Sequence, residues 1–133
     1  MAELFSSDWM KAYMDTWNNE PTLADELERV NFNAVIGYGV EEETAPSVVY
    51  VVNQGRITSI GPHNGEALNW DLRASRDQWE QWMSKPPSLM ALALAYTQRK
   101  LRFRTGDYAA MVKDPRLANS FVKSFDVMRR ALA

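Results

Sequence analysis

The sequence predicts an α+β fold: a single, mainly antiparallel five-stranded sheet with helices covering one face. Two segments, residues 32–40 and 68–74, show the period of two that is typical of strands, and two shorter segments lie between them, separated by turns, at 48–52 and 56–60. Apolar residues with helical spacing occur before this region and after it. Short strands joined by tight turns pair as antiparallel neighbours. Helices at both ends of the chain must then bury their apolar faces against the sheet.

Length and composition limit both the architecture and the chemistry. A chain of 133 residues, 46% of them hydrophobic and 24% charged, has enough apolar material for one core, so residues 1–133 are expected to form a single domain. The chain has no cysteine and one histidine, which excludes a disulfide scaffold and a multi-histidine metal site and argues against a catalytic triad. We therefore expect a protein that is not an enzyme, with no metal and no cofactor.

The location of the protein is predicted from two further observations. The longest strictly apolar run, residues 89–96, is far too short to span a membrane. The first residues lack the basic flank and apolar stretch of a signal peptide. We expect a cytoplasmic protein.

The N-terminal region, residues 1–30, is predicted to form two helices. Trp9, Tyr13 and Trp17 recur at helical spacing after serines that can cap a helix, and Pro21 lies just beyond the end of this pattern. Thr22 can cap a second, short helix.

The central strands are predicted at residues 32–40 and 68–74, where apolar residues recur at every second position, at the β-branched run 48–52, and at the short segment 56–60. The alternation in the fourth strand predicts one buried and one solvent-facing side. The segment Gly37-Tyr38-Gly39 lies inside the first strand, which indicates close packing or a bulge.

The second half of the chain is predicted to be mostly helical. A capping box at residues 75–78 begins one helix, which Pro86 ends, and residues 89–98 form another that is apolar on nearly every side. We expect this second helix to be covered on most sides. Residues 101–104 alternate as a fifth strand, and the region 113–133 forms a C-terminal helix.

Three segments together resemble the sterol-carrier-protein-type (SCP-2-like) lipid-binding domain. They are residues 47–57 (SVVYVVNQGRI), 70–79 (WDLRASRDQW) and 99–107 (RKLRFRTGD), and the region of resemblance is 31–112. The resemblance implies a hydrophobic tunnel between sheet and helices that binds or transfers a fatty acid, an acyl ester, a sterol or a phospholipid, without catalytic residues. Arg99 stands where the family favours glycine, which bears on the shape of the cavity.

The candidate ligand-binding residues are large apolar side chains in excess of what one sheet face needs. Methionine and tryptophan supply the soft, adaptable walls that an apolar ligand prefers, although such a group can equally form an ordinary core. The candidates are Trp79, Trp82, Met83, Leu89, Met90, Leu92, Ala93, Tyr96, Leu101 and Phe103, with Phe121 and Phe125 from the C-terminal helix.

Charge is distributed unevenly along the chain. Residues 1–71 hold 12 acidic and 3 basic residues, and residues 72–133 hold 5 acidic and 12 basic residues. Arg102 and Arg104 alternate with apolar neighbours and are predicted to face outward, where they can contact an anionic ligand group or an anionic membrane, or form a solvated strand edge. The slightly acidic chain argues against nucleic acid as a partner.

Two functions remain open on the sequence. The first is a non-enzymatic carrier of a lipid-like small molecule. The alternative is a protein-interaction or oligomerisation module with a vestigial cavity, in which the C-terminal helix or the Trp9–Trp17 face packs against a partner such as a second copy of the chain.

Overall fold

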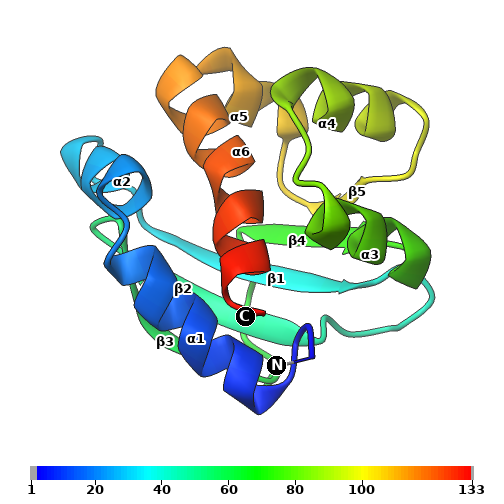
Figure 1. Cartoon of the computed structure of the whole chain (residues 1–133), viewed down its shortest axis with the longest axis horizontal. Coiled ribbons are helices and arrows are strands. Elements are labelled where there is room, and N and C mark those ends of the chain that lie inside the picture. The colour runs from blue at the N-terminus through cyan, green and yellow to red at the C-terminus, as the bar shows by residue number, and fades with distance from the viewer. Residues whose placement is uncertain (1–2, 133) are drawn as a thin grey trace.

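The computed structural model describes residues 3–132 and contains one five-stranded sheet. Its strands lie in the order β3-β2-β1-β4-β5 (Figure 1). Their bounds are β1 Ala34–Val40, β2 Val48–Asn53, β3 Arg56–Gly61, β4 Trp70–Ala74 and β5 Arg102–Thr105. Residues 1, 2 and 133, at the ends of the predicted terminal helical regions, lie outside the described residues.

Three of the four strand pairs are antiparallel, and β1 with β4 is parallel. The predicted mainly antiparallel sheet is confirmed. The parallel pair arises because the chain leaves β3 at one edge and returns as β4 on the far side of β1. This placement brings Tyr38 opposite Val48 on one side and opposite Leu72 on the other.

The helices lie together on one side of the sheet (Figure 1). They are α1 Ser7–Asn18, the π-helical turn η1 Pro21–Asp25, α2 Glu26–Arg29, α3 Arg76–Ser84, α4 Leu89–Thr97, α5 Tyr108–Lys113 and α6 Pro115–Arg130. Side chains of Ser6, Ser75, Ser88, Asp107 and Asp114 accept hydrogen bonds from backbone N–H groups in the first turns of α1, α3, α4, α5 and α6. Such caps satisfy donors that the first turn of a helix leaves free.

The core lies between the helices and the sheet and is rich in aromatic side chains. Trp9, Tyr13 and Trp17 of α1 are completely or almost completely buried. The ring of Trp9 stacks on that of Tyr13 with centroids 4.7 Å apart, and Trp17 donates its indole N–H to the carbonyl of Gly55 at 2.9 Å. Each indole and phenol therefore buries apolar area and still satisfies its polar atom.

The opposite face of the sheet corrects one prediction from the sequence. Asp71 and Arg73 of β4 were expected to face solvent, but both are buried. Arg73 donates two hydrogen bonds to the Asp71 carboxylate, from Nε at 2.6 Å and Nη2 at 3.1 Å, and another to the carbonyl of Glu43 at 2.7 Å. The strand does alternate between two faces, but the chain after β1 folds back over the second face and covers it.

The two glycines of β1 make that cover possible. A Cβ atom on Gly39 would lie 3.0 Å from Cα of Pro46 and 3.1 Å from Nε of Arg73. Gly37 has the side chains of Pro46 and Leu68 at comparable distances. The close packing predicted for Gly37 and Gly39 is therefore present, because side chains here would collide with the covering segment.

Helix α4 corrects a second prediction. It was expected to be covered on most sides, but only Leu92 and Ala95 are buried. Met90 is 81% exposed and Leu94 56% exposed, and Leu89 and Tyr96 are also exposed. The helix packs on its neighbours along one side only, and apolar residues on its other sides remain in contact with solvent.

Candidate ligand-binding site

An apolar pocket opens between the helix-covered face of the sheet and α6. Its sheet wall consists of inward-facing residues of β1, β2 and β4, and its helical wall comes from α1, α2, α5 and α6. The lining residues are Trp17, Leu27, Phe32, Ile36, Tyr38, Tyr50, Trp70, Leu72, Met111, Leu117, Ser120, Phe121 and Ser124. None of these side chains carries a charge.

The pocket is narrow. Its empty space is about 470 Å³ when the open mouth is included, but only about 60 Å³ can hold the centre of a water-sized sphere. Because one water needs roughly 10–15 Å³ by this measure, the interior has room for a few waters. Phe32, Trp70, Leu117 and Phe121 are each half-buried, so part of the wall is in contact with solvent. A long acyl chain would have to move some of the lining side chains.

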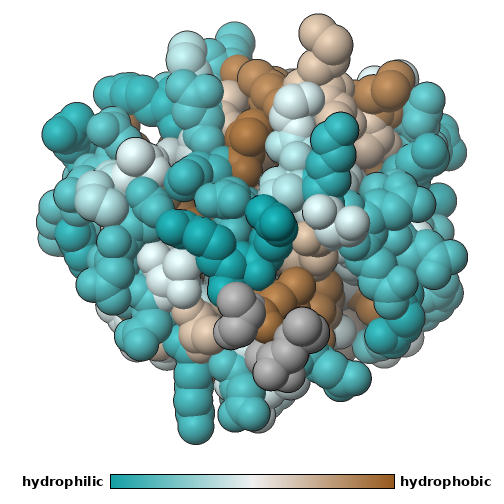
Figure 2. Space-filling view, viewed as in Figure 1, coloured by the Kyte–Doolittle hydropathy of each residue, from teal (hydrophilic) through white to brown (hydrophobic). Residues whose placement is uncertain are grey.

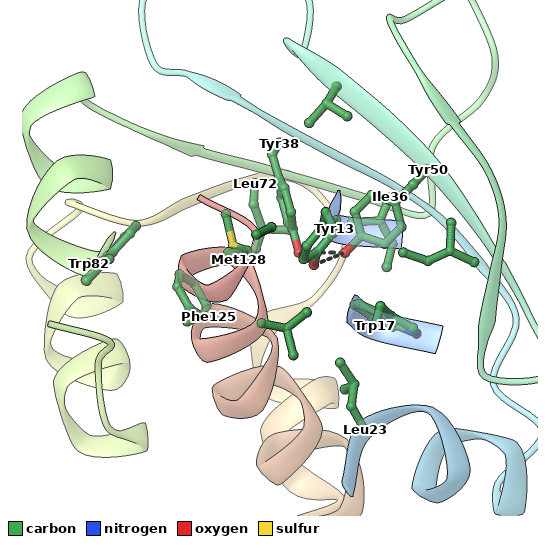
Figure 3. Close-up of a cluster of buried hydrophobic side chains, with 14 of the residues drawn as sticks. Tyr13, Trp17, Leu23, Ile36, Tyr38, Tyr50, Leu72, Trp82, Phe125 and Met128 are labelled. Carbon is green, nitrogen blue, oxygen red and sulfur yellow. Dashed lines mark hydrogen bonds between the residues drawn. The ribbon is translucent and has the colours of Figure 1, made fainter. Parts of the chain in front are cut away.

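Three tyrosine hydroxyl groups meet in the core beside the pocket. Tyr13 and Tyr38 are hydrogen bonded at 2.8 Å, Tyr38 and Tyr50 at 2.5 Å, and Tyr13 donates to Tyr50 at 3.4 Å. Figure 3 shows the oxygens pointing toward one another between the sheet and α6. Tyr38 and Tyr50 also line the pocket, as do Ser120 and Ser124, so four of the lining residues carry a hydroxyl group.

Burial keeps this cluster uncharged. Loss of hydration raises the pKa of Tyr38, and it raises the pKa of Tyr13 and Tyr50 well above the ordinary value near 10. All three hydroxyls therefore remain protonated at neutral pH and can both donate and accept hydrogen bonds. The cluster offers no counter-charge for an anion, and its three O–H donors are used in the bonds among the tyrosines themselves.

The structure distributes the predicted ligand-binding residues over three environments. Phe121 lines the pocket. Phe103 is half-buried beside it, with ring centroids 5.9 Å from Trp70 and 6.2 Å from Phe121. Trp79, Trp82, Met83, Leu92, Leu101 and Phe125 are buried in the core. Leu89, Met90 and Tyr96 lie on the exposed part of α4, and Ala93 is half-buried.

A ladder of aromatic rings joins the exposed helix to the pocket wall. Tyr96 of α4 stacks on Tyr108 of α5 with centroids 4.2 Å apart. Tyr108 contacts Phe103 at 5.6 Å, and Phe103 contacts both Trp70 and Phe121. Three predicted residues, Tyr96, Phe103 and Phe121, are therefore brought together, although only the last lines the pocket.

Several pocket residues were absent from the prediction from the sequence. Ile36, Tyr38 and Tyr50 lie on the inward side of β1 and β2. The alternation of β1 contained a signal for Ile36 and Tyr38, whereas β2 is apolar at five successive positions and gave none for Tyr50. Ser120 and Ser124 are buried on the inward face of α6. These two small side chains lie one turn apart on an otherwise apolar helix face and fill less of the space between α6 and the sheet than large apolar residues would. This pattern is the signal in the sequence that could have indicated the pocket.

The predicted outward bases do face outward. Arg102 and Arg104 lie on β5 at the edge of the sheet and are exposed. Arg104 donates to the carbonyl of Glu41 at 2.9 Å, and Arg102 is 3.8 Å from the carboxylate of the same residue. Neither lines the pocket.

A second, open depression lies between α3 and α4 and has a mixed lining. Trp82, Ala91 and Leu94 share it with Gln78, Gln81, Gln98, Lys85 and Lys100. Among residues 3–132 no group of three or more histidine, cysteine or acidic side chains is placed to hold a metal ion. No helix in the same range is long and apolar enough to cross a membrane.

Comparison with solved structures identifies the fold. Sterol carrier protein 2 superposes with a TM-score of 0.74 over 96% of this chain and 98% of that chain, at 19% identity. A conserved hypothetical protein from Thermus thermophilus, described as a candidate sterol carrier protein, gives 0.67 over 98% and 91% at 20% identity. UbiJ-SCP2, a ubiquinone synthesis protein, gives 0.60 over 90% and 86% at 12% identity.

No protein-family model matches the sequence, and no curated protein matches it. The chain therefore has the sterol-carrier fold, as the resemblance predicted, and the match is one of structure rather than of sequence.

Proposed function

We propose that this chain, which has the fold of sterol carrier protein 2, binds a hydrophobic ligand whose polar end is uncharged, and does so without catalysing a reaction. The observation that carries the proposal is the apolar pocket between sheet and α6, with no charged lining residue and with Tyr38 and Tyr50 in its wall. Burying an apolar chain is worth about 0.8 kcal/mol for each methylene group before the cost of association.

The chemistry of the wall favours a neutral ligand over an ionised fatty acid. A buried carboxylate needs a cation or several hydrogen-bond donors, and the cationic residues predicted for this role, Arg102 and Arg104, lie outside the pocket. A sterol hydroxyl, an ester or a quinone oxygen needs only one neutral hydrogen-bond partner, and Tyr38, Tyr50 and Ser120 all line the pocket. Because the tyrosine hydroxyls already bond one another, a ligand oxygen would replace one bond within that cluster. Two of the structural neighbours, sterol carrier protein 2 and a ubiquinone synthesis protein, have names that refer to uncharged apolar molecules.

The test compares matched probes. We expect saturable binding of the methyl ester of cis-parinaric acid with micromolar or better affinity, and binding of the free acid at neutral pH that is weaker by about tenfold, because its carboxylate loses hydration without gaining a partner. Absence of saturable binding for the ester, the acid and the fluorescent sterol dehydroergosterol would contradict the proposal. If the free acid binds more tightly than the ester, a cationic residue contacts the ligand's carboxylate, and the proposal of an uncharged ligand is wrong.

A variant on α6 locates the ligand. Ser120 is buried and lines the pocket, whereas Asn119 beside it is exposed. Ser120→Leu should abolish ester binding by filling the space. Asn119→Leu introduces the same side chain outside the pocket and should bind as the wild type does. If the pocket is already closed, Ser120→Leu overpacks the core and lowers stability by about 1–3 kcal/mol.

The small interior volume favours a second candidate, an interaction or oligomerisation module with a vestigial cavity. Native mass spectrometry of freshly purified protein separates the two candidates. A monomer with bound lipid mass supports the carrier, whereas a ligand-free dimer supports the module.

A further inference from the structure

The exposed part of α4, which we call the α4 surface, is apolar, and among its residues Tyr96 packs on Tyr108 and Phe103. It consists of Leu89, Met90, Leu94 and Tyr96, which are between 39% and 81% exposed. Figure 2 shows brown and pale-brown residues gathered over α4 toward the top of the molecule. Exposed apolar residues that form a group of this kind mark a contact surface, whereas single ones are ordinary.

The chain segment that contains α4 carries charge of one sign. Residues 81–106 contain five basic residues, Lys85, Arg99, Lys100, Arg102 and Arg104, and no acidic residue. Within the described residues, Lys85, Arg99 and Lys100 form no ion pair. Lys85 and Lys100 line the same depression as Leu94, so two of these bases surround a depression that also contains a residue of the α4 surface.

We propose that the α4 surface docks this protein on an anionic lipid bilayer, with Met90 and Leu94 entering the interface and Lys85 and Lys100 contacting the lipid phosphates. Anionic bilayers attract each nearby Lys or Arg by about 1 kcal/mol. Flexible methionine and leucine side chains enter the acyl boundary, and a tyrosine is suited to the headgroup level. A bilayer therefore satisfies both the apolar residues and the bases beside them.

The α4 surface is separate from the pocket. None of its residues lines the pocket, but the ladder from Tyr96 through Tyr108 and Phe103 leads to the wall residues Trp70 and Phe121. Docking and ligand binding can therefore be tested independently. A variant that no longer binds vesicles but still binds the ester would report on membrane docking and leave the proposed ligand binding unchanged.

The experiment measures co-sedimentation with vesicles of phosphatidylcholine and with vesicles of equal parts phosphatidylcholine and phosphatidylglycerol. We expect binding to the anionic vesicles only, and a marked loss between about 0.1 M and 1 M salt, over which the Debye length falls from about 10 to 3 Å. Met90→Ser/Leu94→Ser and Lys85→Gln/Lys100→Gln should each weaken the partition by about tenfold or more. The control Lys11→Gln/Arg29→Gln removes the same charge from α1 and α2 and should bind nearly as the wild type does.

A label reports the depth of the contact. The chain has no cysteine, so Met90→Cys carries a single environment-sensitive dye, and Lys11→Cys places the same dye on exposed α1. With anionic vesicles, the emission of the dye on Met90→Cys should shift to the blue, and the emission of the dye on Lys11→Cys should not.

Two results would overturn the proposal. One is equal binding of the wild type and both α4 variants. The other is failure of the wild type to co-sediment with anionic vesicles. If the Met90→Ser/Leu94→Ser variant then has a lower mass than the wild type in light scattering, the α4 surface is an interface between copies of the chain.

Discussion

Helices α1 and α4 lie on the same side of the sheet but differ in how far their apolar side chains are buried. Helix α1 contains charged residues, yet Trp9, Tyr13 and Trp17 are at most 3% exposed. Helix α4 contains no charged residue, yet Met90 is 81% exposed. The apolar residues of α1 form a single stripe that the sheet can cover. Those of α4 surround the helix, so whichever side packs inward, another remains outside. Burial therefore follows the arrangement of apolar residues rather than their number.

The largest expected effect comes from the stripe of α1. Trp9→Ala should lower the free energy of unfolding by about 3–5 kcal/mol, because it leaves a cavity and frees the carbonyl of Met128, to which the indole donates at 3.1 Å. Urea denaturation measures the loss.

The matched change on α4 sharpens the comparison. Leu94→Ala removes most of an apolar side chain that is 56% exposed, and it should alter stability by no more than about 0.5 kcal/mol. Comparable losses for Trp9→Ala and Leu94→Ala would break the contrast between the two helices.

A smaller effect than that of Trp9 is expected from the hydroxyl that α1 contributes to the core. Tyr13→Phe removes the partner of Tyr38 at 2.8 Å and should cost about 1–2 kcal/mol. Tyr96→Phe makes the same change on α4, where the residue is 40% exposed, and should be nearly neutral. Urea denaturation of both variants checks the difference.

The tyrosine cluster also predicts a dependence on high pH. Burial raises the pKa of Tyr13, Tyr38 and Tyr50, whereas tyrosines of the unfolded chain ionise near pH 10. The unfolded chain therefore loses protons first, and stability falls as pH rises above about 10. With one tyrosine fewer in the cluster, Tyr13→Phe should lose stability less steeply with pH. An equally steep fall in the two proteins would exclude Tyr13 as a contributor.

The smallest expected change in stability comes from the ion pair between the segment after α1 and helix α6. Arg130 donates to Glu20 at 2.6 Å. Hydrogen bonds from Thr22 and then from Arg130 lower the pKa of Glu20 from 4.5 to about 2. Because the pKa is lowered in the folded state, the stabilisation is present above pH 4.5 and is lost as pH falls toward 2.

Arg130→Gln should therefore reduce stability at pH 7 by at most about 1 kcal/mol, since the arginine is 42% exposed, and by progressively less below pH 4.5. Arg129→Gln removes a neighbouring exposed charge and is the control. Thermal unfolding across this pH range checks both, and a loss that does not change with pH would assign the effect to packing rather than to the carboxylate.

The prediction from the sequence succeeded where the pattern is local. The stripe of α1, the alternation of β1 and the capping residue Ser75 each depend on neighbours a few positions apart, and the structure places them as expected. The resemblance to the sterol-carrier-protein-type domain was carried by residues 47–57, 70–79 and 99–107, and the structural comparison bears out that fold.

The tertiary structure decided what depends on residues far apart in the chain. The tyrosine cluster joins Tyr13 to Tyr38 and Tyr50 across 25 and 37 positions, and no local pattern reveals such a meeting. Arg73 is buried because the segment around Pro46 folds over it, which the alternation of β4 by itself does not contain. The sequence by itself determined that α4 is helical and apolar. Which of its sides meets solvent was decided by its neighbours, because a helix that is apolar all round carries no preference of its own.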